Sequence, residues 1–291
     1  ETTHGGEGDP CAPKFGGAQR VVNVIDTRQA YLQKVVKEGV RQLGHAQAAE
    51  NSIHYSYEMV ALTPATAKEL GMEISEEDAK RAYVEMSGRK GFGVKADDLL
   101  DELERKATDA VQRNLEEGEA EGAKEIGRQV AIAALRYFML RFGRNKVIAF
   151  DLNEALKFEG DSGPYLQYST VRVQNIFRKM KDRGVNPMLG EQEVDNLTLH
   201  QGLTDEMWEL VRLSAELPAA IRRGVDGLEM SVITQYLLDL AQKFNSFYHK
   251  YPILNEKDDA ERQRRAVCAE VFRKTMVGAL ELLGIPVPER M

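Results

Sequence analysis

The sequence predicts a mainly α fold, in which a short α/β piece precedes a bundle of helices. Strand-like runs are confined to the first third of the chain, whereas after Gly91 nearly every apolar pattern repeats at helical spacing. The 291 residues are 43% hydrophobic and 29% charged, a balance typical of globular proteins with enough apolar groups for two cores. We therefore expect two structural parts with different secondary structure.

The α/β piece begins after residues 1–19, which are rich in Gly and Pro and are expected to form a loose tail. Residues 21–25 are a β-branched run suited to a buried parallel strand, residues 31–43 carry apolar side chains at helical spacing, and residues 52–57 alternate like a second strand. This order predicts a right-handed crossover and a parallel sheet. Two strands are an incomplete sheet, so we expect further strands or another surface to complete it.

The helical part is predicted to start with an acidic first turn at Asp97. Residues 104–128 are strongly charged with few large apolar groups, which indicates an exposed helical connector. Apolar sets at helical spacing then predict four helices, and a last helix is expected to end at Gly284, a C′ glycine followed by two prolines. The four sets are Ile126, Val130, Ala133, Ala134, Tyr137 and Phe138; Tyr165, Tyr168, Val171, Val173, Ile176 and Phe177; Met207, Leu210, Val211, Ser214 and Leu217; and Ile233, Tyr236, Leu237, Leu240, Phe244 and Phe247.

The composition of the chain argues against some classes of protein, such as membrane, secreted and zinc-binding proteins. The sequence has no run of about 18 apolar residues and no signal-like start, so we expect a cytoplasmic protein with no membrane partner. Cys11 and Cys268 are too far apart in the chain to suggest a disulfide framework or a zinc site, and no metal ligands are predicted. The net charge of -7 does not exclude nucleic acid, because one local basic stripe can neutralise phosphates.

The most specific local signal is the segment Met86-Ser87-Gly88-Arg89-Lys90-Gly91, in which two glycines flank a pair of cations. Such a loop can close over a triphosphate, because its cations stabilise charge on the phosphates and its glycines let backbone N–H groups approach the oxygens. Taken alone, the same segment is more typical of a solvated basic turn, and its context favours the phosphate-binding interpretation.

This segment, followed by an acidic helix start at residues 97–102, resembles the second ATP signature of class I aminoacyl-tRNA synthetases in its arginyl version. Residues 151–156, with Pro164-Tyr165-Leu166-Gln167-Tyr168, resemble the start of the arginyl family's anticodon-binding domain. Residues 282–291 resemble the family's C-terminus, which closes on a methionine. The resemblance runs from about Lys14 to Met291 in the family's order.

The resemblance implies four parts. They are a loose tail over 1–19, a remnant of a Rossmann-like catalytic domain over 20–105, a helical connector over 106–163 and an all-α anticodon-binding domain over 164–291. It further implies that Ser87, Arg89 and Lys90 are catalytic, that Met86, Ser87, Gly88 and Lys90 bind ATP with Mg²⁺ as counter-ion, and that Gln29 helps to read arginine.

Some residues depart from the family's pattern. Glu58 stands where the family usually has glycine, and Thr27-Arg28 replaces a more familiar turn. None of the five histidines forms the His-x-Gly-His motif that class I synthetases use to hold ATP, so we expect this chain alone not to activate arginine. His54 matches a strand end near the family's active site, but it also fits a half-buried strand histidine with one hydrogen bond.

RNA contacts are expected in the helical part. Arg172, Asn175, Arg178 and Lys179 have helical spacings that place most of them on one polar face, which fits either RNA phosphates or a merely solvated surface. Tyr165, Tyr168 and Tyr248 are candidates to stack on bases, although we expect at least two of the three to belong to the core. The resemblance adds Met291, because the family's C-terminus lies beside the anticodon loop.

The sequence therefore predicts the C-terminal portion of an arginine–tRNA ligase, with an arginine-accepting tRNA, ATP and arginine as partners and an N-terminal half supplied by other sequence. Two other hypotheses stay open. One is a naturally shortened relative that binds tRNA or a protein without catalysis, and the other is a helical adaptor with no nucleotide chemistry.

Overall fold

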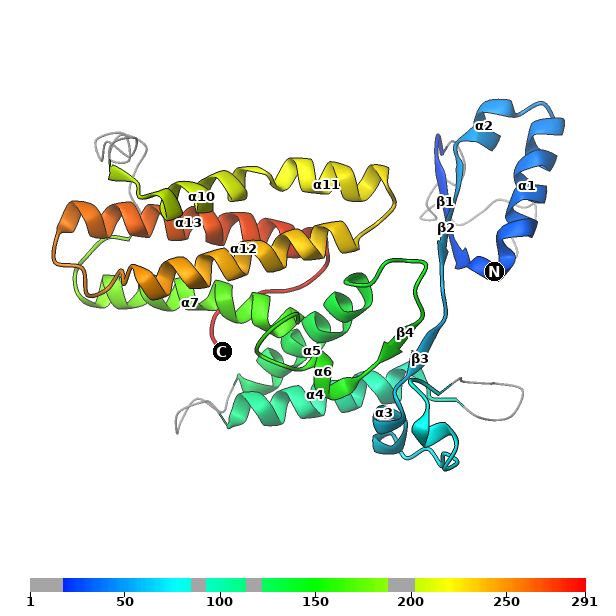
Figure 1. Cartoon of the computed structure of the whole chain (residues 1–291), viewed down its shortest axis with the longest axis horizontal. Coiled ribbons are helices and arrows are strands. Elements are labelled where there is room, and N and C mark those ends of the chain that lie inside the picture. The colour runs from blue at the N-terminus through cyan, green and yellow to red at the C-terminus, as the bar shows by residue number, and fades with distance from the viewer. Residues whose placement is uncertain (1–17, 85–92, 114–121, 188–201) are drawn as a thin grey trace, which may run out of the picture. The chain divides into compact units, whose positions relative to one another are not determined.

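The computed structural model describes residues 18–84, 93–113, 122–187 and 202–291. It is mainly α, as predicted, and it forms two compact units that meet in sequence between Glu58 and Met59 (Figure 1). Among the residues that the structure describes, no helix is both long enough and apolar enough to cross a membrane.

The first unit is the predicted strand–helix–strand. It contains β1 (Val21–Asp26), the 3₁₀ turn η1 (Thr27–Gln29), α1 (Ala30–Gln42), α2 (Ala46–Glu50) and β2 (Ser52–Tyr57). The strands β1 and β2 pair in parallel, with Val21 opposite Ser52 and Asp26 opposite Tyr57. The parallel sheet predicted from the sequence is confirmed.

The prediction of a buried first strand was wrong. Val22 and Val24 are 48% and 63% exposed, because the described sheet has only two strands and no layer covers them. The helix α1 buries none of its residues. Its half-buried side contains Val40 together with Lys37 and Arg41, which form ion pairs with Glu50 of α2. Its apolar side is exposed, and consists of Tyr31, Leu32, Val35, Val36 and Leu43.

The second unit begins with a small α/β layer. Its elements are β3 (Val60–Leu62), α3 (Pro64–Glu69), η2 (Asp78–Lys80), α4 (Ala96–Gln112), α5 (Ala123–Leu140), β4 (Ile148–Phe150) and α6 (Leu152–Ala155). The strands β3 and β4 pair in parallel, with Leu62 opposite Phe150. The sequence did not indicate these strands, because three residues are too few to show an alternation.

The expectation of an exposed connector over 104–128 was also wrong for its described residues. Ala107 and Val111 of α4 are buried against α5, where Ala123 and Ile126 are buried in turn. Small side chains let the two helices approach closely, so a burial stripe exists although large apolar residues are rare. The acidic first turn of α4, with Asp97 and Asp98, is confirmed.

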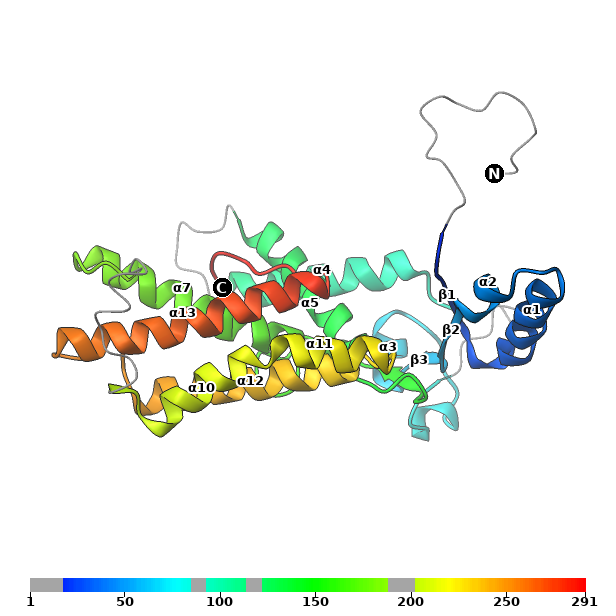
Figure 2. The same ribbon diagram turned by 90° about the horizontal axis from the view of Figure 1, so that it is seen from above.

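The rest of the second unit is the predicted bundle. It contains α7 (Gly163–Asp182), α10 (Asp205–Ala215), α11 (Leu217–Asp226), α12 (Ser231–Lys250) and α13 (Asp259–Leu282), which lie side by side around one core (Figures 1 and 2). The predicted set of residues 207–217 is divided between α10 and α11, because Pro218 starts the second of these helices.

The helix α5 joins the two layers of the second unit. Tyr137 packs into the bundle core, whereas Phe138 packs into the core under β3 and β4. At the crossing with α7, Gly163 lies against Ala133, and a Cβ atom at Gly163 would come within 2.1 Å of the Ala133 carbonyl oxygen. This contact is possible only for glycine, and it brings the start of α7 onto α5.

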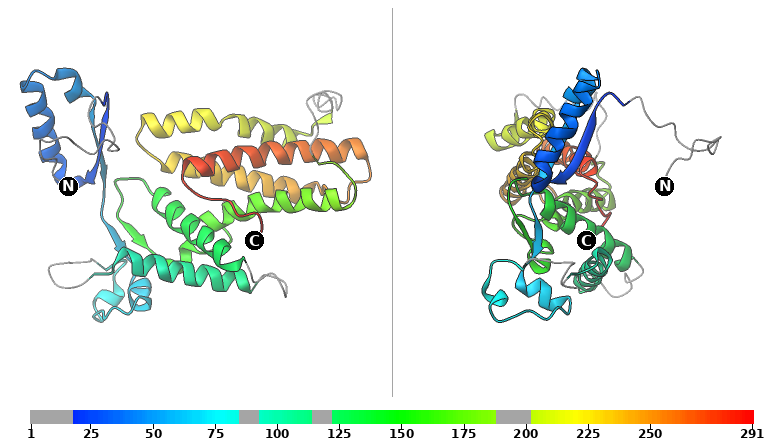
Figure 3. Two further views of the ribbon diagram at one scale, coloured as in Figure 1. Left: turned by 180° about the vertical axis from the view of Figure 1, so that it is seen from behind. Right: turned by 90° about the vertical axis from the view of Figure 1, so that its right-hand side faces the viewer.

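The chain leaves α13 through the predicted C′ glycine. Gly284 has a φ of 66°, its N–H donates to the carbonyl of Glu281, and the N–H of Ile285 donates to the carbonyl of Leu280. These two bonds form a Schellman motif, with Leu280 and Ile285 both buried in the bundle core. The tail after Gly284 then turns back beside α7 (Figure 3).

Candidate nucleic-acid interface

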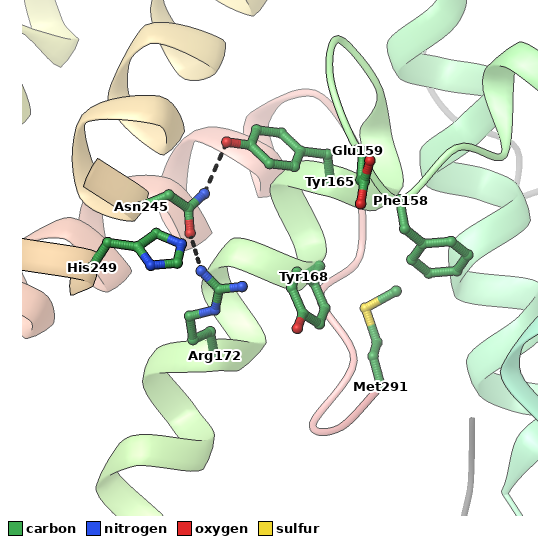
Figure 4. Close-up of a pocket in the computed structure, with 8 residues that line it drawn as sticks. All are labelled: Phe158, Glu159, Tyr165, Tyr168, Arg172, Asn245, His249 and Met291. Atoms are coloured by element: carbon green, nitrogen blue, oxygen red, sulfur yellow. Dashed lines mark hydrogen bonds between the residues drawn. The ribbon is translucent and has the colours of Figure 1, made fainter. Parts of the chain in front are cut away.

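A pocket of about 660 Å³ opens between α7, α12, the loop over 156–162 and the end of the chain. Its size is within the range of small-molecule sites. Figure 4 shows the side chains that line it, which are Phe158, Glu159, Tyr165, Tyr168, Arg172, Asn245, His249 and Met291. Four of these, Tyr165, Tyr168, Arg172 and Met291, are residues that the sequence analysis predicted to bind RNA.

The helix α7 presents its predicted RNA-binding residues along one face. Tyr165, Tyr168, Arg172, Asn175 and Lys179 follow one another at steps of three, four, three and four residues, which is the spacing of a single helical stripe. The N-cap Ser162, whose hydroxyl accepts from the N–H of Tyr165 at 3.2 Å, and Pro164 in the first turn start the helix here. The first three residues of the stripe line the pocket, and Lys179 is exposed further along the helix.

The guanidinium of Arg172 is held from several directions. It donates to the side-chain oxygen of Asn245, and its central carbon lies 4.9 Å from the ring centre of Tyr168 and 5.4 Å from that of Tyr248. The Asn245 amide donates in turn to the Tyr165 hydroxyl and to the Ser169 hydroxyl, each at 2.9 Å. These contacts fix a cation in the pocket wall before any ligand binds.

Arg172 makes no ion pair with any residue of the described chain. Glu159 lines the same pocket without reaching the ion-pair distance. A guanidinium has five N–H donors, and the Asn245 contact uses one nitrogen, so Arg172 keeps donors for a ligand oxygen or nitrogen. The pocket thus offers a cation that no carboxylate of the described chain neutralises.

The tyrosines divide as expected between core and surface. Tyr165 and Tyr248 are half-buried and pack against the bundle core, and the Tyr248 ring stacks on Phe244 at 6.2 Å between ring centres. Tyr168 is 40% exposed. One aromatic face on α7 is therefore open to a planar ligand, while the other two rings support Arg172 and Asn245.

Met291 lies at the opposite wall of the pocket. Its side chain is half-buried and packs with Phe158 beside the core of the α/β layer (Figure 4). The sequence did not predict four of the residues that line the pocket, which are Asn245, His249, Phe158 and Glu159. Asn245 and His249 are one turn apart on α12, beside the apolar residues Phe244 and Phe247. Two polar residues on one side of an otherwise apolar helix were the feature of the sequence that could have indicated this site.

The other predicted site residues lie elsewhere. Residues 86–91, with the ATP and catalytic candidates Met86, Ser87, Gly88, Arg89 and Lys90, lie outside the described residues. Gln29 is exposed at the start of α1. His54 is half-buried, with its Nε2 atom 2.9 Å from the carbonyl oxygen of Ile25, as a strand histidine with one hydrogen bond.

The residues that depart from the family's pattern contact one another. The Thr27 hydroxyl donates to the Glu58 carboxylate at 3.0 Å, and the Arg28 guanidinium donates to Asp26, which holds the pKa of Asp26 at about 2. Glu58 and the Thr27-Arg28 turn thus form one local arrangement at the ends of β1 and β2.

All four arginines of α13 form ion pairs with acidic residues, Arg264 with Glu261 among them. Arg262 pairs with Asp259, Arg265 pairs with Glu256 and Glu261, and Arg273 pairs with Glu270. Among the basic residues of the described bundle, the stripe on α7 is therefore the better candidate for phosphate contacts.

Comparison with known proteins relates this arrangement to one family. The DALR anticodon binding domain matches residues 166–291. The arginine–tRNA ligase of Ignicoccus hospitalis is 34% identical over 274 residues, which are 94% of this chain and 39% of that protein. The corresponding ligase of Deinococcus radiodurans is 32% identical over 286 residues, which are 96% of this chain and 43% of that protein.

A solved structure agrees with these relatives. The arginyl-tRNA synthetase of Thermus thermophilus superposes with a TM-score of 0.74 and 28% sequence identity, covering 94% of this chain and 41% of that one. The chain thus spans about two fifths of the length of the relatives that it matches.

Proposed function

We propose that the pocket on α7 binds the anticodon loop of an arginine-accepting tRNA. The proposal starts from two findings: this chain is homologous to arginyl-tRNA synthetases over their C-terminal part, and it carries a DALR anticodon-binding domain. The observation that carries the proposal is the pocket itself. An open tyrosine ring, a fixed guanidinium and an apolar methionine converge there, and they come from α7 and from the end of the chain.

These groups match the chemistry of an unpaired base. In the proposed complex a base leaves the anticodon stack and lies on the exposed ring of Tyr168, with Met291 against its other side. The free N–H groups of Arg172 donate to acceptors on the edge of the base. Asn175 and Lys179 continue the stripe along α7, and the ammonium of Lys179 neutralises a phosphate of the RNA backbone.

The proposed activity of the complete protein is the ATP-dependent attachment of arginine to tRNA in the cytoplasm. In this proposal Ser87, Arg89 and Lys90 contact the ATP phosphates with Met86 and Gly88, Mg²⁺ supplies counter-charge, and Gln29 contacts arginine. The exposed apolar side of α1 supports a further partner. A polypeptide corresponding to the rest of the relatives would cover Tyr31, Leu32 and Val35 and extend the two-stranded sheet.

Binding of fluorescent tRNA, measured by anisotropy, tests the RNA proposal. Stacking of a base on an aromatic ring contributes about 1–3 kcal/mol, so Tyr168→Ala should weaken the affinity for an arginine-accepting tRNA roughly 5- to 150-fold. Trp208→Ala is the matched control, because Trp208 is an exposed aromatic residue of the same bundle, 59% accessible, and it does not line the pocket.

Equal and weak binding of all tRNAs by the unaltered chain would contradict anticodon recognition. An equal loss of affinity in the Tyr168 and Trp208 variants would assign binding to a general surface effect. Both variants should keep the thermal unfolding temperature of the unaltered chain, because both side chains are exposed.

A further inference from the structure

The last residues of the chain form a tail without regular secondary structure, which is attached to α7 by side chains. Ile285 is fully buried and Val287 packs against the bundle core. Pro286 and Pro288 have no N–H group, so the tail cannot form a regular strand with a neighbour. Its carbonyl groups nevertheless have donors, and these donors are side-chain amides.

Two glutamines of α7 supply these donors. The amide nitrogen of Gln167, which is fully buried, donates to the carbonyl of Pro286 at 2.6 Å and to the carbonyl of Gln129 on α5 at 3.0 Å. The amide nitrogen of Gln174, in the orientation that satisfies its neighbours, donates to the carbonyls of Glu289 and Pro288 at 3.0 and 3.2 Å.

The spacing of Gln167 and Gln174 along α7 fits the spacing of the carbonyls that they contact in the tail. Seven residues of an α-helix rise about 10.5 Å, and three residues of extended chain span about 10 Å. Gln167 and Gln174, seven residues apart on one face of α7, can therefore reach carbonyls three residues apart in the tail, those of Pro286 and Glu289. Beyond Glu289 the tail turns, and Met291 reaches the pocket wall beside Phe158 (Figure 4).

We propose that Gln167 and Gln174 are positioning residues that clamp the tail so that Met291 forms one wall of the RNA-binding pocket. The RNA part of this inference rests on the proposed function, whereas the clamp itself does not. Without the two amides, the carbonyls of Pro286, Pro288 and Glu289 would turn to water, and the tail would lose the contacts that direct its last residues toward the pocket.

A carboxypeptidase that removes apolar C-terminal residues tests the clamp without RNA. In the 291-residue chain such an enzyme releases Met291 and then stops at Arg290, so the release rate reports how often the tail detaches. Gln174→Met keeps the length of the side chain and removes its donors. Loss of the clamp hydrogen bonds should accelerate release of Met291 on the order of fivefold or more.

Matched variants separate clamping from general destabilisation. Gln242→Met, at an exposed position of α12, should leave the release rate unchanged. Gln174→Lys restores a donor and should return the rate toward that of the unaltered chain. Gln167→Met is a second test at the buried clamp, read at a temperature where thermal unfolding shows the variant to be folded. Equal release rates in all variants would overturn the proposal.

The link between the tail and RNA binding is tested in separate assays with tRNA. Saturating tRNA should slow release of Met291 from the unaltered chain, and Gln174→Met should weaken tRNA binding by about the factor measured for Met291→Ala. Faster release with unchanged tRNA affinity would overturn the link between tail and pocket. Failure of the proposed function is distinguishable, because then neither Tyr168→Ala nor Met291→Ala changes tRNA binding while the tRNA-free release assay still responds.

Discussion

At the scale of single residues, Arg172 shows why the pocket needs a guanidinium. Its planar group contacts the rings of Tyr168 and Tyr248 and donates to Asn245 at the same time. A lysine could not reproduce this arrangement, because an ammonium is a hydrated point charge without a flat face. The cation therefore keeps its orientation in the free protein and loses little freedom when a ligand binds.

Cys268 provides a prediction of pH dependence at the same scale. Burial in the bundle core raises the pKa of its thiol to about 12, whereas an unfolded chain ionises this thiol at about 8.5. Because the folded chain keeps the proton, the stabilisation is complete below about pH 8.5 and is lost as the pH rises toward 12. We expect the free energy of unfolding to fall by about 2 kcal/mol between about pH 8 and about pH 10.

Urea unfolding at several pH values measures this slope. Cys268→Ala should show a flatter dependence over the same interval, whatever constant offset its cavity introduces. The buried tyrosines Tyr137 and Tyr236, whose pKa values are raised by burial, add to the fall only near pH 10, and they do so equally in both chains, so the difference between the two slopes reports Cys268. The same slope in both chains would show that Cys268 does not cause the alkaline destabilisation.

At the scale of elements, the crossing of α5 and α7 depends on a missing side chain. A Cβ atom at Gly163 would lie 2.1 Å from the Ala133 carbonyl oxygen and 3.0 Å from the Tyr137 Cβ atom. Gly163→Ala should therefore separate the helices and destabilise the fold by about 1–3 kcal/mol. Because Tyr165 and Tyr168 follow on the same helix, RNA binding should weaken as well.

Gly278 of α13 is the matched control for this prediction. A Cβ atom there meets no atom within 4 Å, so Gly278→Ala should stabilise the chain by about 0.5–1 kcal/mol. Thermal and urea unfolding would give both values. Stabilisation by both substitutions would mean that α5 and α7 do not approach each other as closely as the structure has them.

At the scale of the whole molecule, the first unit carries an exposed apolar surface on α1, which we propose as a docking site for a further polypeptide. The large apolar side chains Tyr31, Leu32, Val35 and Val36 of α1 are exposed, whereas Lys37 and Arg41 on its half-buried side form ion pairs with α2. We predict no pyrophosphate exchange by the chain alone with ATP, arginine and tRNA. Exchange should appear when a polypeptide corresponding to the remaining part of a relative is added, because that polypeptide would cover α1 and extend the sheet.

Substitutions on α1 test whether this surface is the docking site. Val35→Asp introduces a charge into the apolar side and should prevent the rescue of exchange, whereas Lys34→Asp changes the polar side and should not. Exchange by the chain alone would contradict the prediction, and so would equal rescue of both variants.

Much of the local structure follows from the sequence alone. The strands β1 and β2, the helices α4, α5, α7 and α12, and the glycine that ends α13 are all properties of nearby residues, through periodicity, capping and backbone preference. Four residues of the pocket were also predicted, because a family resemblance indicated residues that helical spacing by itself could not distinguish from core or solvated surface.

Only the tertiary structure decided which of these residues meet. Asn245 and His249 of α12, Phe158 of a loop and Met291 of the tail come together with α7 through contacts between segments up to 133 residues apart in the chain. The polar contact side of α1, the three-residue strands β3 and β4 and the glutamine clamps also depend on distant partners. Local sequence patterns determine whether a segment forms a helix or a strand. The packing of distant segments determines which side chains lie next to one another, and therefore which residues form a binding site.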